Sequence, residues 1–258
     1  MTRRLVRINT MSEKITVTII TKNEEANIDR CLKSVDWADE IVVADSGSTD
    51  ATLEICKRHH CKIIMHEWLG FGPMKRLAVD AAMNDWIFSI DADEEVTDVL
   101  KKHIADIIKN PEFNGYRIKR RSFYLGKPIN YCGWQRDYQL RLFNRRFGNF
   151  NAKQVHESVQ MTGEVGRIES TLLHYTYPTL QSHVLRMNRY ADLGSRQLKH
   201  KGKSSSIFSA VMRGTFKFIK MYLLNLGILD GKQGFILCYN SAFGVYLKYI
   251  RLWELNRS

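Results

Sequence analysis

The stretch Trp86-Ile-Phe-Ser-Ile-Asp-Ala-Asp-Glu-Glu95 decides the fold of this chain. Five apolar or small residues run directly into four carboxylates within five positions, a pattern typical of a buried parallel strand whose carboxyl end opens on a ligand site. If residues 91–93 stay extended, Asp91 and Asp93 lie on one face and Ala92 lies on the other. The sequence therefore predicts two carboxylates that converge on one point.

Two close carboxylates repel each other unless a cation or a shared proton lies between them. Mg²⁺ commonly binds through one or two carboxylates while substrate phosphates and water complete its coordination. The pair thus indicates a site for a metal ion and a diphosphate. The alternative is a solvated strand end that leads into the first turn of a helix from Thr97 to Lys109.

Three further strands precede this one, and each is followed by a polar loop and a helical pattern. The strands are expected at Ile15 to Ile20, Glu40 to Ala44 and Cys61 to His66, and a helix is expected from Met74 to Met83, with Lys75 and Arg76 in its first turn. Strands that alternate with helices predict an α/β fold with a parallel, doubly wound sheet. Asp45 and Asp91 then lie at the carboxyl ends of strands, where such sheets bind ligands, although Asp45 could instead serve as a cap and turn residue.

The positive charge of the chain is concentrated at its C-terminal end. The net charge is +12, and residues 182–258 contain 13 Lys and Arg but only 3 Asp and Glu. Such a surplus indicates an anionic partner, namely nucleic acid, an acidic membrane surface or phosphate-bearing substrates. The five cysteines form no disulfide or zinc pattern and are typical of a cytoplasmic chain, and the N-terminus lacks the apolar region of a signal peptide.

Four motifs resemble those of the inverting family-2 glycosyltransferases, which have the GT-A fold, a Rossmann-like and mostly parallel sheet flanked by helices. These motifs are Thr21-Lys22-Asn23-Glu24-Glu25, Asp45-Ser46-Gly47-Ser48-Thr49-Asp50, residues 72–76, and Asp91-Ala92-Asp93-Glu94. Within that family the chain looks most like the lipopolysaccharide core β-1,4-glucosyltransferases. That narrower resemblance is carried by residues 91–95 and 137–143 and by Val155-His156-Glu157.

The resemblance implies a UDP-sugar donor and a divalent metal ion, Mg²⁺ or Mn²⁺. It assigns the nucleotide-sugar pocket to Thr21, Asn23, Glu24, Asp45, Lys75, Asp91 and Ala92. Asp45 would lie near the uracil or ribose, and Lys75 stands where relatives carry another basic residue. Asp93, together with Asp91, would hold the metal on the diphosphate, where a Lewis acid stabilises the leaving UDP.

Inversion in a single displacement requires a base that takes the proton of the acceptor hydroxyl. Asp137 is our first candidate and Glu157 the second, although Asp137 could instead pair with Arg136 or Arg141. The loop before Asp137 contains Tyr131, Trp134 and Arg136, which we expect to bind the acceptor sugar. His156 is a candidate third metal ligand, and its alternative is a structural role.

The sequence divides into a loose segment 1–13, a GT-A catalytic domain 14–181 and a basic helical extension 182–258. Residues 14–110 would form the nucleotide-binding half of the catalytic domain and residues 111–181 the acceptor half. In the extension, Arg213, Lys217 and Lys220 form one stripe of an otherwise apolar helix, a pattern typical of a helix that lies in a membrane interface with its basic side toward anionic lipid. Packing on the catalytic domain or a homo-oligomer contact is the alternative.

Together these features predict a glucosyltransferase that moves glucose from UDP-glucose to a heptose of the lipopolysaccharide inner core. We expect it on the cytoplasmic face of the inner membrane, with a lipid-linked oligosaccharide acceptor. A related transferase with another nucleotide sugar or glycan acceptor is the first alternative. A basic nucleic-acid-binding α/β protein is the second, but the sequence contains no nucleic-acid motif, so we expect no nucleic-acid partner.

Overall fold

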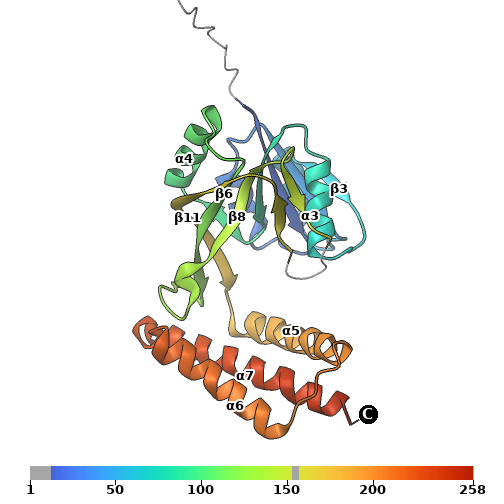
Figure 1. Ribbon diagram of the computed structural model, residues 1–258. Helices are drawn as coiled ribbons and strands as arrows, with labels where there is room; N and C mark the ends of the chain where they lie inside the picture. The colour runs from blue at the N-terminus through green and yellow to red at the C-terminus, as the bar shows by residue number, and fades with distance from the viewer. Residues whose placement is uncertain (1–12, 153–156, 258) are drawn as a thin grey trace, which may run out of the picture. The chain divides into compact units, whose positions relative to one another are not determined.

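The structure is a computed structural model that describes residues 13–152 and 157–257 (Figure 1). The chain forms two compact units. Unit 1 comprises the residues up to 120 and residues 138–173, and unit 2 comprises residues 121–137 and 174–258. Unit 2 therefore contains residues 121–137 and 174–181, two segments that the sequence analysis placed in the catalytic domain.

Unit 1 is built around a mixed sheet whose first half is parallel. The strands of the sheet are β1 (Ile15–Thr21), β2 (Glu40–Asp45), β3 (Lys62–Met65), β4 (Trp86–Asp91), β5 (Glu94–Val96), β6 (Gly115–Tyr124), β7 (Lys127–Pro128), β8 (Tyr138–Asn144) and β11 (Val165–Tyr177). Of these, β7 and the last residues of β6 and β11 belong to unit 2. Their order is β3-β2-β1-β4-β8-β6-β11-β5, with β7 paired to β6. β1 pairs in parallel with β2 and β4, β2 pairs in parallel with β3, and β8 is antiparallel to both β4 and β6. A separate antiparallel pair is formed by β9 (Gly148–Phe150) and β10 (Val159–Met161).

The β-branched runs of β1 and β2 are buried because helices cover both faces of the sheet. One face packs against α1 (Ile28–Ser34), α2 (Thr52–Arg58) and α4 (Asp98–Lys109). In α4, Leu100, Ile104 and Ile108 recur at helical spacing and point into this core, and the Thr97 hydroxyl caps the helix by accepting the Leu100 N–H. Burying each such side chain contributes roughly 1.5–3 kcal/mol. The predicted α/β fold class is confirmed.

The other face of the sheet packs against α3 (Phe71–Asp80), which begins three residues earlier than predicted. Gly70 has a φ of 101°, a conformation that favours glycine, and Pro73 is tolerated because it lies in the first helical turn. Lys75 consequently lies in the second turn and its side chain is buried. The expectation that Lys75 occupies the first turn was wrong, because the Gly-Pro stretch starts the helix instead of delaying it.

Unit 2 contains three long helices joined by irregular turns. The helices are α5 (Leu180–His200), α6 (Ile207–Ile219) and α7 (Gly231–Leu255). The π-helical turn η2 (Lys220–Leu224) and the 3-10 turn η3 (Gly227–Asp230) connect α6 to α7. α7 packs against both α5 and α6 (Figure 1). The 121–137 segment, with its 3-10 turn η1 (Trp134–Arg136), shares their core, which consists of Tyr124, Ile129, Cys132, Met221, Leu237 and Cys238.

Among the helices of residues 13–152 and 157–257, none has a run both long and apolar enough to cross a membrane.

Candidate active site

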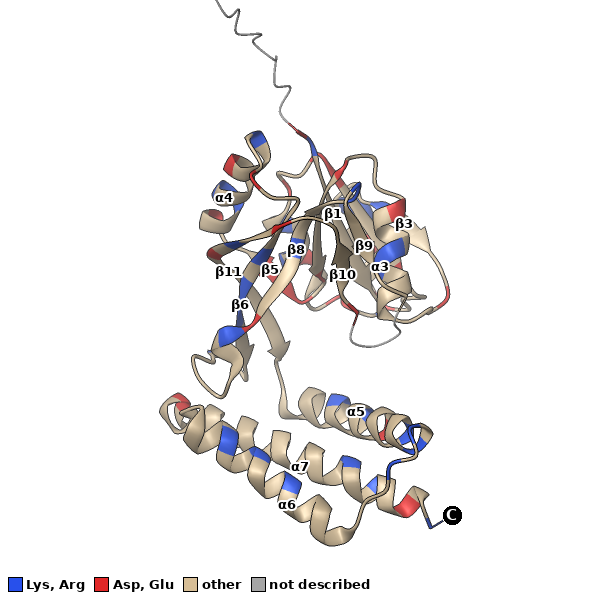
Figure 2. Ribbon diagram, viewed as in Figure 1, with Lys and Arg blue, Asp and Glu red and all other residues tan. Residues whose placement is uncertain are grey.

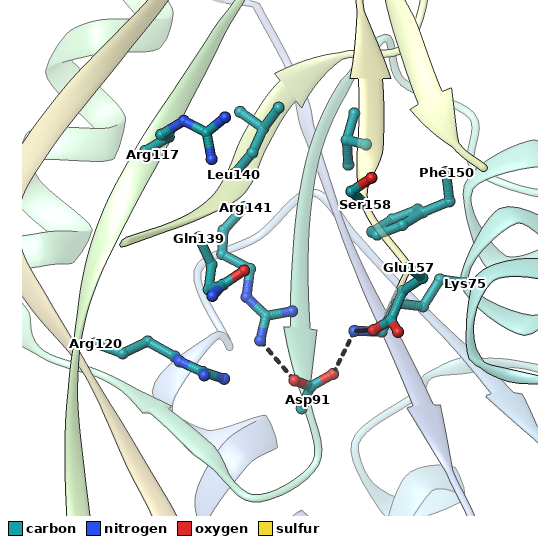
Figure 3. Close-up of a pocket in the computed structure, with 11 residues that line it drawn as sticks. Lys75, Asp91, Arg117, Arg120, Gln139, Leu140, Arg141, Phe150, Glu157 and Ser158 are labelled. Atoms are coloured by element: carbon teal, nitrogen blue, oxygen red, sulfur yellow. Dashed lines mark hydrogen bonds and ion pairs between the residues drawn. The ribbon is translucent and has the colours of Figure 1, made fainter. Parts of the chain in front are cut away.

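Asp91 is the last residue of β4, and its carboxylate lies between two cations (Figure 3). Its Oδ1 is 2.8 Å from Nζ of Lys75, and its Oδ2 is 2.5 Å from a terminal nitrogen of Arg141. Burial alone would raise the pKa of Asp91, but Arg141 and Lys75 together hold it well below its ordinary value. Asp91 is therefore an anion near neutral pH.

Glu94 forms a second layer behind Asp91, a role that the sequence analysis missed. Its side chain is fully buried, and its Oε1 lies 2.7 Å from Arg141 and 3.3 Å from Arg120. Its Oε2 accepts the backbone N–H of Asp91 at 2.9 Å. Burial of Arg141 lowers its pKa, but the carboxylates of Asp91 and Glu94 raise it by more. The pKa of Arg141 therefore lies above its ordinary value, and the guanidinium stays charged.

The chain between these two carboxylates turns instead of staying extended. Ala92 and Asp93 form a turn between β4 and β5, which corrects the expectation that residues 91–93 continue the strand. The period of two therefore does not apply, and Glu94, not Asp93, is the carboxylate that returns to Asp91. No local signal in the sequence marks this arrangement, because the partners of Glu94 are arginines on two later strands, Arg120 on β6 and Arg141 on β8.

Lys75 links Asp91 to a carboxylate from a distant part of the chain. Its ammonium lies 3.0 Å from Oε1 of Glu157, which follows the residues outside the described part and precedes β10. The Lys75 side chain is only 6% exposed, and the ring of Phe150 lies 5.6 Å from its ammonium. Lys75 thus reduces the repulsion between Asp91 and Glu157 at close range.

These side chains line a cavity of about 210 Å³ within unit 1. Its walls are formed by Lys75, Asp91, Arg117, Arg120, Gln139, Leu140, Arg141, Phe150, Glu157, Ser158 and Val159 (Figure 3). The lining includes four cationic and two anionic side chains. The cavity therefore has a surplus of positive charge and suits a ligand with phosphate or carboxylate groups.

The loops after β1 and β2, where the nucleotide pocket was predicted, are joined by hydrogen bonds. The Asn23 N–H donates to Oγ of Ser48, and Oδ1 of Asn23 accepts the Thr49 N–H, both at 2.8 Å. The Glu24 N–H donates to Oγ1 of Thr52 at 2.8 Å. Asn23 and Glu24 are thus brought together with the 45–50 loop at the carboxyl end of the sheet.

Asp45 lies opposite Thr21 in the β1–β2 register, and its side chain is buried. Oδ1 of Asp45 accepts the N–H groups of Gly47 and Ser48 at 2.8 Å, and the Ser48 hydroxyl donates to its Oδ2. These bonds fix the tight loop, as the cap-and-turn alternative predicted. Direct contact of Asp45 with a uracil or ribose stays a prediction. It would require the nucleotide to replace one or more of these hydrogen-bond partners of the carboxylate.

The predicted acceptor residues and Asp137 belong to unit 2 and are not among the residues that line the cavity. The Tyr131 N–H donates to Asp230 at 2.9 Å, and Trp134 packs against the core of unit 2. Arg136 is exposed. Of the two candidate bases, Glu157 is the one that the structure brings to Asp91 and Lys75, while the roles of Asp137 and the three acceptor residues stay predictions.

The donor set at this site fits a metal ion that takes most of its ligands from a substrate. Within residues 13–152 and 157–257, no three His, Cys, Asp or Glu side chains cluster as a ready-made metal site. Both Asp91 oxygens already pair with cations, so metal ligation by Asp91 would require Lys75 or Arg141 to move. His156 lies outside the described residues. The role of Asp93, in the turn after β4, as a ligand of a metal bound mainly through diphosphate oxygens stays a prediction.

Comparisons with known proteins assign the chain to a family. Residues 16–160, more than half of the chain, match the model of Glycosyl transferase family 2. The chain therefore belongs to family 2 of the glycosyltransferases and is an enzyme of that class.

Several relatives match over nearly the whole chain, and two of them illustrate the range. An uncharacterized glycosyltransferase of Rickettsia typhi is 30% identical over 264 residues, which cover 95% of this chain and 88% of the relative. The lipopolysaccharide core biosynthesis glycosyltransferase LpsC of Rhizobium meliloti is 28% identical over 244 residues, which cover 92% and 90%. The resemblance to lipopolysaccharide core glycosyltransferases is thus confirmed.

A solved structure supports the fold. The mannosyltransferase PcManGT of Pyrobaculum calidifontis, in complex with GDP-Man and Mn²⁺, superposes with a TM-score of 0.54 at 14% identity, over 95% of this chain and 88% of that one. At this identity the likeness concerns the fold alone, which is the GT-A fold predicted from the motifs.

Proposed function

We propose that the protein transfers glucose from UDP-glucose to a heptose of the lipopolysaccharide inner core, with inversion at the anomeric carbon. The observation that carries this proposal is the Asp91 carboxylate, held between Lys75 and Arg141 in a cavity that also contains Glu157. The similarity to LpsC, which is named for lipopolysaccharide core biosynthesis, supports the acceptor class.

The donor would lie at the carboxyl end of the parallel strands, as ligands do in such sheets. Asn23, Glu24 and Asp45 shape the edge at which the nucleotide would bind, and Asp91 would meet the ribose. Asp93 would hold Mg²⁺ or Mn²⁺ against the diphosphate. When bound, that ion supplies a Lewis acid that stabilises the negative charge on the leaving UDP.

Glu157 would act as the base on the acceptor side. Its carboxylate would take the proton of the attacking heptose hydroxyl while the hydroxyl oxygen forms its bond to C1 of glucose and the bond from C1 to UDP breaks. Lys75 holds Glu157 beside Asp91 and keeps a positive charge near the site where UDP leaves. Asp137 is the second candidate for this role.

The surplus of cations at the cavity supports an anionic acceptor. Arg117 and Arg120 come from β6 and Gln139 from β8, the two antiparallel strands that follow the nucleotide-binding half. Guanidinium groups bind phosphate in bidentate geometry, so a phosphorylated, lipid-linked core oligosaccharide suits this wall. The protein would act at the cytoplasmic face of the inner membrane, where such an acceptor is embedded.

A transfer assay with a panel of nucleotide sugars tests the proposal. We expect transfer of glucose from UDP-glucose to heptose-containing core acceptors, loss of transfer after chelation of divalent ions, and a large loss in Asp93→Ala with an unchanged unfolding midpoint. Transfer from another nucleotide sugar alone would favour the related-transferase alternative. Salt-dependent binding of DNA or RNA, with no change in melting temperature on addition of UDP, would favour a nucleic-acid binder.

A further inference from the structure

The outward side of α6 and η2 carries an apolar stripe that the described residues of unit 2 leave exposed. Phe208, Met212, Phe216, Ile219 and Leu223 recur every three or four residues and so lie on one side of the helix. Their exposed fractions are 75%, 51%, 62%, 40% and 52%. Such spacing normally marks the buried side of a helix, and here it marks the exposed one.

The opposite side of α6 is occupied by α7. Ala210 and Gly214 are buried there, and a Cβ at Gly214 would lie 3.2 Å from the carbonyl oxygen of Ala242 and 3.1 Å from Cβ of Tyr246. This close approach fixes the rotation of α6 about its axis. The apolar stripe therefore points away from the helix bundle because α6 packs closely on α7 through its opposite side.

The turn that follows α6 extends the apolar surface. Leu224, Leu226, Ile228 and Leu229 are 69%, 48%, 50% and 59% exposed, and Leu226 has a φ of 56°, so the backbone turns sharply at this point. We call the α6 stripe together with these four residues the docking face. A monomer rarely exposes so many adjacent large apolar side chains unless the surface binds a partner.

The charges around the docking face indicate what kind of partner it meets. Residues 193–253 contain ten Lys and Arg but one acidic residue, Asp230. Asp230 is 2% exposed and accepts the N–H groups of Asn130 and Tyr131. The segment that carries the docking face therefore has a surplus of cations, some of them visible along α6 in Figure 2, and no exposed carboxylate lies between residues 193 and 253.

This charge pattern favours an anionic lipid surface over a second copy of the chain. A symmetric dimer through the docking face would bring the same cations against each other, which costs free energy unless carboxylates intervene. A bilayer with anionic headgroups matches both features, because its acyl chains accept apolar side chains and its headgroups attract Lys and Arg.

The basic stripe of α6 does not form its outward side. The sequence analysis expected the Arg213, Lys217 and Lys220 stripe to face the membrane. Instead, the guanidinium of Arg213 lies over the ring of Tyr249 on α7 at 4.5 Å, and Lys217 is partly buried, which lowers its pKa. The basic stripe lies on the flank of α6, and the apolar stripe is the side that points outward.

We propose that the docking face inserts into the interface of a bilayer with anionic headgroups, with Phe208, Phe216 and the leucine-rich turn below the headgroups and the flanking cations at headgroup level. This proposal names a surface and a mode of binding that the transfer reaction does not require. It rests on unit 2 alone and stands or falls independently of the donor and acceptor proposed above.

The first test measures cosedimentation of the full chain with vesicles of phosphatidylcholine alone and of phosphatidylcholine mixed with phosphatidylglycerol. We expect binding to the mixed vesicles and a reduction of about tenfold or more in the partition coefficient of Phe216→Ser/Ile219→Ser. Met83→Ser, which changes a 73% exposed methionine in unit 1, is the matched control and should bind like the unchanged protein. High salt should weaken binding without abolishing it.

A second measurement applies even if the serine variant folds poorly. In Phe216→Trp, mixed vesicles should shift the tryptophan emission to shorter wavelength relative to the protein without this substitution. Equal binding of the serine variant and the unchanged protein, or no emission shift, would overturn the proposal. So would a dimer that dissociates in the serine variant while neither protein binds vesicles. Hydrolysis of UDP-sugar in solution should be unaltered in the serine variant, which separates failure of docking from failure of catalysis.

Discussion

The ammonium of Lys75 lies 2.8 Å from Asp91 and 3.0 Å from Glu157, so one buried cation joins the tip of β4 to a residue more than sixty positions later. Asp91 also has Arg141 as a partner, whereas among the described residues Lys75 is the cation that forms an ion pair with Glu157. Removal of this ammonium would therefore affect the position of Glu157 more than that of Asp91.

Lys75→Met should lower glucosyl transfer by at least about a hundredfold, because a cation preorganised beside the leaving diphosphate is lost. Lys75→Arg should recover part of the activity. Arg76→Met is the matched control, since Arg76 is exposed and its surface pair with Asp80, at 3.6 Å, is worth less than about 1 kcal/mol. Equal kcat/KM for Lys75→Met and Arg76→Met would show that Lys75 does not contribute to transfer.

Glu157→Gln should lower kcat by roughly 10²–10⁴ if Glu157 is the base, with little change in the affinity for UDP-glucose. Asp137→Asn should then retain most of the activity, because Asp137 belongs to unit 2 and does not line the cavity. Single-turnover transfer and titration with UDP-glucose separate the chemical step from binding. The reverse result, an inactive Asp137→Asn and an active Glu157→Gln, would assign the base to Asp137.

Glu94→Gln should destabilise the protein by about 3 kcal/mol or more, because a fully buried carboxylate that pairs with Arg141 and Arg120 is removed and leaves those cations uncompensated. Glu95→Gln should cost less than about 1 kcal/mol, since Glu95 is 30% exposed and lies 3.6 Å from Arg30. Urea unfolding at neutral pH measures both. If the two variants unfold alike, Glu94 does not have the structural role described here.

The parallel strands β1 to β4 were predictable to within about a residue at most ends, because β-branched runs and polar loops are local signals. Asp91 at the tip of β4 followed from the same pattern. The turn at Ala92 and Asp93 was not predictable, since it depends on β5 joining the far edge of the sheet beside β11 and on Arg141 reaching both Asp91 and Glu94. Those contacts join residues about fifty positions apart, and no local propensity encodes them.

The orientation of α6 in the helical extension could likewise not be predicted from the sequence. Spacing alone placed Arg213, Lys217 and Lys220 on one stripe of α6, and the structure keeps them on one flank. Which stripe faces outward was not available from the sequence, because it is set by the close approach of Gly214 to α7. A helix with one basic and one apolar stripe offers two orientations, and only its neighbour decides between them.

His183 makes the stability of unit 2 sensitive to mildly acidic pH. Its imidazole is 3% exposed, and Nδ1 lies 2.9 Å from the hydroxyl of Tyr124. Burial, with a smaller effect from Arg186, lowers the pKa of His183 to about 4. A pKa depressed in the folded state contributes stability above the unfolded value of 6.5, and this contribution is lost as pH falls toward 4.

The unfolding free energy should therefore fall by up to about 1.4 kcal/mol per pH unit between pH 6.5 and 4 through this group. His183→Gln should flatten that slope, whereas His103→Gln, on the exposed side of α4, should leave it unchanged. Urea unfolding at several pH values, followed by a signal from unit 2, measures the slope. An identical slope in His183→Gln would show that other groups cause it.

Arg117 is placed at the cavity by an irregularity in β6. The register between β6 and β8 shifts between Tyr116 and Arg117, and such bulges redirect the following side chain. No hydrogen bond or ion pair joins the Arg117 side chain to another of the described residues, although it lines the cavity (Figure 3). A guanidinium in this setting is available to a phosphate of the acceptor.

Arg117→Gln should raise the KM for a phosphorylated core acceptor about tenfold, with little change in kcat or in the KM for UDP-glucose, since one charge-assisted bond contributes roughly 1.5–3 kcal/mol. Arg121→Gln is the control, because Arg121 is on the same strand but does not line the cavity. The decisive comparison uses the dephosphorylated acceptor, for which the Arg117→Gln effect should vanish. If it persists there, or if the KM for UDP-glucose rises instead, Arg117 serves the donor and the acceptor phosphate is bound elsewhere.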